Sequence, residues 1–219
     1  MSCQGGRIGC GVGGRSTDRG HGVQLDWGRL LVGQLEFYWD VHLRPRLEGL
    51  GDEEYFWEPV EGCWSLRRGA DGRWRLDGGP EPSPPPVTTI AWRLVHVGAG
   101  CLGNRASTFF GDGSVPADAD MFDPRHLPAD LPGDAGAAVA FLERSYRHWH
   151  DGVAGLDEEG LARPLGPRGG PYAEDPMAEL VAHISREVMH HGAEIALLRD
   201  LYRATGATSR DSRLVPRRP

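Results

Sequence analysis

Two side chains near the C-terminus have the types and the spacing to bind a metal ion together. Glu187 and His191 are four residues apart in Arg186-Glu-Val-Met-His-His-Gly-Ala-Glu-Ile195, so on a helix they lie on one face, one turn apart. The other residues of that face are apolar: Leu180, Ile184, Val188, Ile195 and Leu198. Burying a carboxylate and an imidazole costs on the order of several kcal/mol unless they are paired or bind a metal. The spacing therefore predicts either a metal site or a buried salt link.

A third ligand must come from elsewhere in the chain, because zinc and similar ions need at least three protein ligands. His96 is the best candidate, since it lies in the middle of the apolar segment Ile90-Ala-Trp-Arg-Leu-Val-His-Val-Gly98. Small residues follow it and would leave room for a ligand or water beside the imidazole: Ala99, Gly100 and Gly103. A His, Glu, His set with open coordination positions is typical of a catalytic metal site. His96, Glu187 and His191 are therefore the candidate metal ligands, and a buried salt link between Glu187 and His191, or with an Arg, is the alternative.

Four other side chains could take part, and each has a simpler interpretation. His190 points about 100° away from His191 on a helix, as an outer partner of the site or as a surface group. Glu194 could accept a hydrogen bond from a ligand and orient it, or be a surface carboxylate. His42 shares an apolar stripe and could reach the mouth of the site, although the pattern favours a satisfied core histidine. Cys101 lies on an apolar face, and we expect it to fill the core rather than act as a nucleophile.

Four long helical patterns would position these side chains. They run over about residues 26–47, 88–104, 135–153 and 173–203, with Asp26 and Thr88 or Thr89 as N-caps. Between the first two, Cys63-Trp-Ser-Leu-Arg67 and Arg73-Trp-Arg-Leu76 flank a Gly-Ala-Asp-Gly turn, which predicts a small hairpin. With so little strand, the expected fold is all-α, a four-helix bundle whose binding site is built from inward side chains of facing helices.

The bundle is expected over residues 25–204. Residues 1–24 are Gly-rich with scattered Arg, which indicates a flexible N-terminal segment, and residues 205–219 are expected to be a disordered Arg-rich tail. The N-terminal segment has no apolar signal core, and no stretch reaches the roughly 18 apolar residues of a membrane span. We expect a cytoplasmic protein that does not interact with membranes.

Composition limits the class of partner. The net charge is −7, and all 24 cationic side chains are Arg, so a nucleic-acid-binding surface is not expected. The four cysteines are scattered without a C-x-x-C pair, which favours reduced thiols over a disulfide framework. The expected partner is a small-molecule substrate. A homodimer, common among bundles with apolar outer faces, is left open.

Two segments carry a resemblance to a known family. Thr88-Thr-Ile-Ala-Trp-Arg-Leu-Val-His96 together with residues 186–202 resembles the DinB-like (DinB/YfiT) superfamily of metalloenzymes, and residues 39–50 and 52–64 support this. The similarity spans roughly residues 25–202. Members are four-helix bundles that hold a divalent metal, often through three histidines. The resemblance therefore implies a metal cofactor, with zinc expected first and nickel or iron(II) as alternatives.

The chain departs from the all-histidine pattern. Glu187 stands four residues before His191, and Arg186, four before His190, cannot be a ligand. The Arg-Glu-Val-x-x-His pattern is similar to the mycothiol-dependent maleylpyruvate isomerase branch, whose His, Glu, His triad corresponds to His96, Glu187 and His191. This implies an S-transferase or isomerase that adds a low-molecular-weight thiol to small electrophiles. A metal-dependent hydrolase on the same site and a non-catalytic stress-response bundle remain alternatives.

Overall fold

The computed structural model describes residues 25–79, 82–111, 113 and 115–206. Within these ranges the chain is mostly helical and contains one two-stranded sheet. The segment expected to be a flexible N-terminus, residues 1–24, and residues 207–219 of the expected tail lie outside the described residues.

The first helical segment begins where the sequence predicts. Asp26 accepts a hydrogen bond from the backbone N–H of Arg29 at 2.9 Å, which satisfies one of the free donors of a helix N-terminus. The segment is continuous but changes its winding: α1 (Trp27–Phe37) passes through a π-helical turn, Tyr38–Leu43, into α2 (Arg44–Leu47).

The second helical segment begins at the predicted cap. The side chain of Thr89 accepts from the N–H of Trp92 at 3.2 Å. The segment consists of α4 (Ile90–Val95), a π-helical stretch (His96–Gly103) and α5 (Asn104–Phe110). The prediction of an end near Asn104 was wrong, because α5 continues to Phe110 and packs against the third helix. Burial of Ala106 and Thr108 stabilises these extra turns.

The two remaining long helices are α6 (Ala135–Ala154) and α8 (Met177–Ala204), with the short α7 (Glu158–Ala162) between them. Asp134 caps α6 by accepting from the N–H of Ala137 at 2.8 Å. We predicted that the last helix starts near Ala173, but it starts at Met177, directly after Pro176. Proline has no N–H and disfavours helical geometry in the residue before it, so the 3₁₀ turns of Gly166–Tyr172 do not join α8.

The predicted hairpin is present. Strands β1 (Leu66–Arg68) and β2 (Trp74–Leu76) pair antiparallel, with Leu66 opposite Leu76. Trp74 stacks on Phe56, with ring centroids 5.2 Å apart, which fixes the hairpin beside the short helix α3 (Asp52–Tyr55). A further 3₁₀ turn, Pro124–His126, lies in the long loop before α6.

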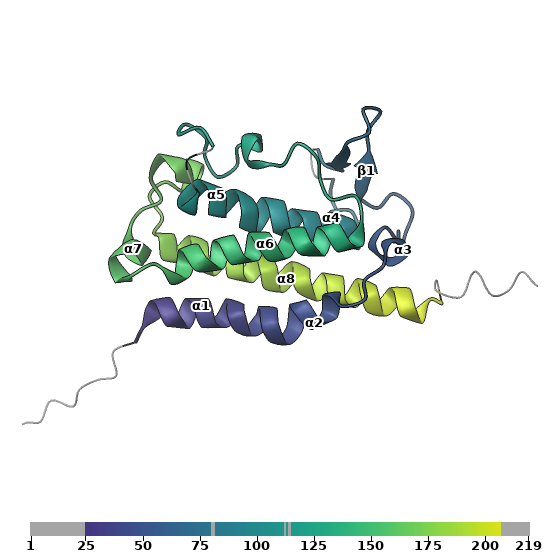
Figure 1. The fold of residues 1–219 in the computed structure, drawn as a ribbon, viewed down its shortest axis with the longest axis horizontal. Coiled ribbons are helices and arrows are strands. Elements are labelled where there is room, and N and C mark those ends of the chain that lie inside the picture. The colour runs from purple at the N-terminus through teal and green to yellow at the C-terminus, as the bar shows by residue number, and fades with distance from the viewer. Residues whose placement is uncertain (1–24, 80–81, 112, 114, 207–219) are drawn as a thin grey trace, which may run out of the picture.

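The long helical segments lie side by side, with α1–α2, α8, α6 and α4–α5 seen in that order from bottom to top in Figure 1. The hairpin and α3 lie at one end, and α7 lies at the other. The core between them is filled by large buried side chains, among them Leu35, Trp39, Leu94, Leu102, Leu142, Trp149, Ile184 and Val188. Trp39 of the first segment stacks on Tyr146 of α6 at 3.9 Å.

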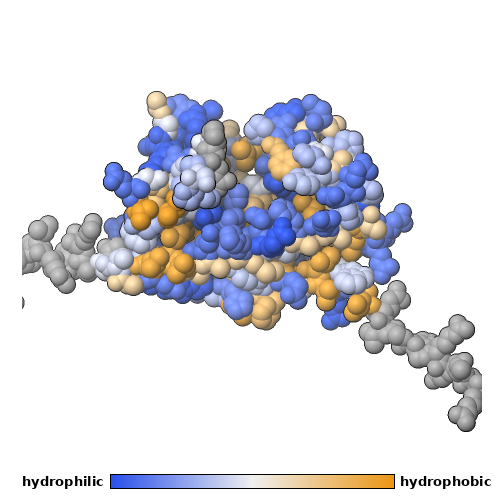
Figure 2. All heavy atoms as spheres, turned by 180° about the vertical axis from the view of Figure 1, so that it is seen from behind, coloured by the Kyte–Doolittle hydropathy of each residue, from blue (hydrophilic) through white to orange (hydrophobic). Residues whose placement is uncertain are grey.

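The opposite face of the molecule is largely hydrophilic, and hydrophobic surface appears at both ends of its lower part (Figure 2). Several large apolar side chains of the first helical segment are exposed: Trp27, Leu30, Phe37 and Val41. Among the described residues, no helix combines the length and the apolar character that a membrane span requires.

Candidate metal centre

Glu187 and His191 lie one turn apart on α8 and face each other. Nε2 of His191 is 3.4 Å from Oε2 of Glu187. The His191 side chain is 9% exposed and that of Glu187 is 27% exposed, so His191 is buried and Glu187 is partly buried. The apolar residues that the sequence assigns to this face are all buried: Leu180, Ile184, Val188, Ile195 and Leu198. The predicted interruption of a core stripe by two polar groups is therefore confirmed.

His96 comes to the same place from the second helical segment. Its ring lies 4.8 Å from the His191 ring, centroid to centroid, and nearly perpendicular to it. Trp92, one turn earlier, stacks on the other side of His96 at 4.8 Å, and its indole N–H donates to the backbone carbonyl of Asp77 at 2.8 Å. The tryptophan thereby holds the His96 ring in one orientation toward α8. The structure thus brings together the three residues that the sequence singled out.

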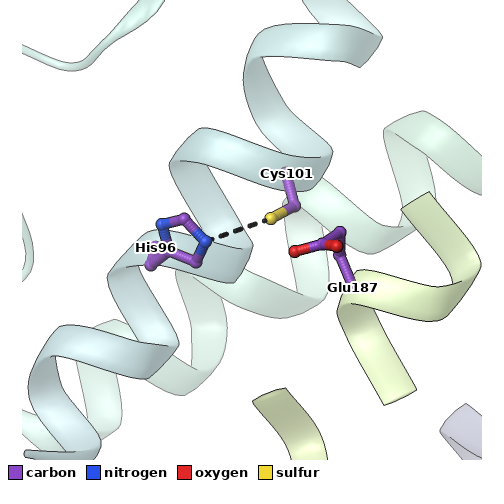
Figure 3. Close-up of side chains that lie close together, drawn as sticks. All are labelled: His96, Cys101 and Glu187. Carbon is purple, nitrogen blue, oxygen red and sulfur yellow. Dashed lines mark hydrogen bonds between the residues drawn. The ribbon is translucent and has the colours of Figure 1, made fainter. Parts of the chain in front are cut away.

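A fourth side chain, Cys101, lies beside these three and forms a cluster with them (His96, Cys101, Glu187 and His191). Its Sγ is 3.6 Å from Nε2 of His96, and one donor atom from each of His96, Cys101 and Glu187 lies within 4.8 Å of the others. Figure 3 shows the thiol between the imidazole and the carboxylate. The sequence pattern did not place Cys101 beside His96, because residues five apart on an α-helix are about 140° apart around its axis. The π-helical turn brings them onto one side.

Glu194 fixes the orientation of His191. Its Oε2 lies 2.8 Å from Nδ1 of His191 and 3.0 Å from Nε of Arg93. A carboxylate only accepts hydrogen bonds, and the 2.8 Å contact of Nδ1 with Glu194 is shorter than the 3.4 Å contact of Nε2 with Glu187. We therefore assign the imidazole proton to Nδ1, which leaves the lone pair of Nε2 facing Glu187. Arg93 Nη1 also lies 3.1 Å from Nδ1, but two donors cannot share that contact, so we assign the proton of Nδ1 to the bond with Glu194.

The comparison with protein families identifies the superfamily of the chain. A family model described as the DinB superfamily matches residues 34–195. This chain belongs to the DinB superfamily. The matched range includes His96, Cys101, Glu187 and Glu194. Neither the curated proteins nor the solved structures contain a match to this chain.

The donor set of this DinB-superfamily chain suits a divalent ion. Burial lowers the pKa of His96 to about 4, helped by the neighbouring His191 and Arg93, so at neutral pH it offers the unprotonated imidazole that a metal requires. Burial raises the pKa of Cys101 to about 12, so without an ion it is a thiol. Burial also favours a higher pKa for Glu194, but the hydrogen bond from His191 and the charge of Arg93 lower it overall.

The other histidines named from the sequence lie further out. His190 is exposed, with its Nε2 3.4 Å from Oε1 of Glu194. His190, His191 and Glu194 could form a metal-binding group of their own. The guanidinium of Arg93 already forms an ion pair with the carboxylate of Glu194, so it would repel a metal cation bound to that carboxylate. His42 is exposed and contacts the rings of Phe37 and Tyr38, so we do not include it in the site.

A pocket of about 370 Å³ lies one turn of α8 away from Glu187, and none of His96, Cys101, Glu187 and His191 lines it. It is lined by apolar and aromatic side chains, among them Met121, Phe122, Leu165 and Tyr172, and by the cationic groups of Arg105 and Arg186. His183 also lines it and connects it to the cluster, because its Nδ1 is 3.9 Å from Oε1 of Glu187. A small molecule in this pocket would therefore lie one helical turn from the candidate ligands.

Proposed function

We propose that this DinB-superfamily chain is a metal-dependent enzyme whose ion is held by His96, Glu187 and His191 inside a four-helix bundle. One observation carries the proposal. Two ligand atoms about 2.0–2.2 Å from a tetrahedral zinc ion lie about 3.4 Å apart, which is the distance from Nε2 of His191 to Oε2 of Glu187.

The alternative of a buried salt link explains less. His191 already has a carboxylate partner, because Glu194 accepts from its Nδ1. That link needs neither the Glu187 carboxylate at Nε2 of His191 nor the neutral imidazole of His96, whose ring centroid lies 4.8 Å from that of His191. They are the parts that a cation requires, since two neutral nitrogens and one carboxylate leave the ion with net positive charge.

Nitrogen and oxygen donors of this kind suit zinc first and also nickel or iron(II). When bound, the ion supplies Lewis-acid chemistry by lowering the pKa of a reacting thiol or water toward neutrality. The residues of the chain hold and orient the site: Glu194 keeps the proton of His191 on Nδ1, and Trp92 holds the plane of His96.

For the reaction we propose transfer of a low-molecular-weight thiol, of the mycothiol type, to a small electrophile, as an S-transferase or isomerase. The resemblance of Arg186-Glu-Val-x-x-His191 to the thiol-dependent branch supports this, and the pocket of about 370 Å³ has room for a small substrate. Arg105 and Arg186 line this pocket and would favour an anionic group on the substrate. The reduced thiols of the cytoplasm would supply the co-substrate.

The test is metal analysis of protein purified without added metal. Wild type should carry a stoichiometric divalent ion, and His191→Ala should lose it. His148→Ala is a matched control, because His148 is exposed on α6 and its Nε2 lies 3.3 Å from the backbone carbonyl of Phe110. Equal metal content in all three proteins would contradict the proposal.

The reaction is tested separately with the metal-loaded protein. We expect it to consume mycothiol or glutathione in the presence of small electrophiles and to be inactive on a panel of esters. Ester hydrolysis without thiol consumption would replace the transferase by a hydrolase on the same ion.

A further inference from the structure

We propose that Cys101 is a further ligand of the ion, so that the resting enzyme holds its own sulfur in the coordination position that the substrate thiol takes. This inference rests on the proposed function and adds a regulatory property to the same site. The metal would then be held by two nitrogens, one oxygen and one sulfur, and an incoming thiol would have to displace Cys101 before reacting.

The distance between the two donors supports this assignment. A zinc–nitrogen bond of about 2.0–2.1 Å and a zinc–sulfur bond of about 2.3 Å at a tetrahedral angle place the two ligand atoms about 3.6 Å apart. Sγ of Cys101 and Nε2 of His96 are 3.6 Å apart. The distance between His96 and Cys101 therefore matches that of two ligands on one zinc ion, as the distance between Glu187 and His191 on α8 does.

The backbone is built to present the thiol in this way. His96 is the first residue of the π-helical stretch and Cys101 is the sixth, so the hydrogen bonding of a π-helix, from residue i to i+5, places them one turn apart. The wide turn needs Gly103, because a Cβ there would lie 2.7 Å from the carbonyl oxygen of Gly98. The close approach of α6 to this stretch needs Gly98, because a Cβ there would lie 2.9 Å from a ring carbon of Phe141 on α6.

The surroundings of Cys101 also suit a ligand. The residue is only 5% exposed, and the thiol lies beside the imidazole of His96 within the cluster (Figure 3). The guanidinium of Arg105, one turn further along, donates to the backbone carbonyl of Gly100, the residue before Cys101. A coordinated thiol loses its proton to solvent and remains on the metal as a thiolate. No oxidant or reductant is required.

Cobalt(II) in place of the native metal gives a direct optical readout, because a thiolate ligand produces a near-ultraviolet sulfur-to-cobalt charge-transfer band. Wild type loaded with cobalt should show this band. Cys101→Ser should bind cobalt and lack the band, whereas Cys63→Ser should keep it. Cys63 is the matched control, since it is also a buried free cysteine, and its Sγ lies 2.9 Å from the carbonyl of Val60.

Adding 2-mercaptoethanol to cobalt-loaded Cys101→Ser should restore the band, because an external thiol would then take the vacated position. If the band does not return, Cys101 does not stand in the position of the substrate thiol. If Cys101→Ser does not fold, X-ray absorption at the zinc edge of wild type and Cys63→Ser replaces it, and one sulfur at about 2.3 Å is expected in both.

The two proposals fail in different ways. Wild type that binds cobalt without the charge-transfer band, or a band that persists in Cys101→Ser, overturns the role of Cys101 and leaves the His, Glu, His site standing. Wild type that binds no cobalt and no zinc overturns both.

Discussion

Nδ1 of His191 lies 2.8 Å from Oε2 of Glu194, one turn further along α8. The pair fixes which nitrogen of the imidazole carries the proton, and it leaves Nε2 directed at Glu187. Because Glu187, His191 and Glu194 all belong to one helix, α8 supplies two candidate ligands and the group that orients one of them. His96 and Cys101 complete the cluster from the segment opposite.

Glu194→Gln should weaken metal binding about 10–100-fold, the usual effect of losing the acceptor behind a ligating histidine. The amide cannot hold the charge of Arg93 or polarise the imidazole in the same way. Titration calorimetry with zinc measures the affinity. His190→Gln is the control, because His190 contacts the other oxygen of Glu194 from an exposed position and should leave the affinity nearly unchanged. Unaltered zinc affinity in Glu194→Gln would show that this hydrogen bond does not serve the metal.

A buried ion pair fixes the far end of α8. Nε and Nη2 of Arg199 lie 2.8 and 2.9 Å from the two carboxylate oxygens of Glu54, and the side chains are only 2% and 8% exposed. Arg199→Met leaves Glu54 buried without a partner, and such a change costs about 3–5 kcal/mol of stability. Urea unfolding measures this loss.

The zinc affinity of Arg199→Met should stay close to that of wild type while the protein is folded, because Arg199 lies two turns beyond His191 on α8. Arg75→Ala is the matched control, since it breaks an exposed ion pair with Asp71 and should barely change the unfolding midpoint. If Arg199→Met and Arg75→Ala lower the free energy of unfolding by the same amount, burial does not decide how much an ion pair stabilises this protein.

The close approach of α6 to the π-helical stretch can be tested at Gly98. Gly98→Ala places a Cβ 2.9 Å from the Phe141 ring, and overpacking of this kind costs about 1–3 kcal/mol. Gly136→Ala is the control, because the new Cβ would meet only an ordinary contact at 3.5 Å and alanine favours the helix by up to about 1 kcal/mol. Thermal unfolding should therefore move in opposite directions. A Gly98→Ala protein as stable as wild type would contradict the tight packing.

Local signals in the sequence predicted much of this arrangement. The caps at Asp26 and Thr89 lie at the starts of the helices, and the hairpin forms around its Gly-rich turn. The face of α8 that carries Glu187 and His191 follows from the 3.6-residue period, which is a property of the backbone alone.

Two features depended on contacts that the local sequence does not contain. The π-helical stretch from His96 to Gly103 changes the winding, so α-helical spacing placed Cys101 on another face than His96. The continuation of α5 to Phe110 depends on packing against α6, which local propensity does not report.

His150 on α6 and Glu36 on α1 provide a test of pH dependence away from the metal cluster. Nε2 of His150 lies 2.8 Å from Oε1 of Glu36, and Nδ1 lies 3.0 Å from Asp151. Burial lowers the pKa of His150, but the hydrogen bonds to Asp151 and Glu36 and their charges raise it overall. A histidine with a raised folded pKa contributes stability that is complete below its unfolded pKa of about 6.5 and is lost as pH rises through the folded value.

Wild type should therefore be more stable than His150→Gln at pH 6, by about 0.2–1 kcal/mol for so exposed a pair, and this difference should shrink by pH 8. Urea unfolding at the two pH values measures it. Glu36→Gln should reduce the same pH dependence, and Asp151 should retain the remainder. If the difference in stability between wild type and His150→Gln stays constant or grows from pH 6 to pH 8, protonated His150 does not stabilise the fold through Glu36.

The most direct test of the metal centre is anomalous diffraction from crystals grown with zinc and recorded at the zinc absorption edge. The account predicts one strong peak within about 2.0–2.2 Å of His96 Nε2, His191 Nε2 and a carboxylate oxygen of Glu187. A fully occupied peak elsewhere in the protein, or no peak between α8 and the π-helical stretch at saturating zinc, would contradict it.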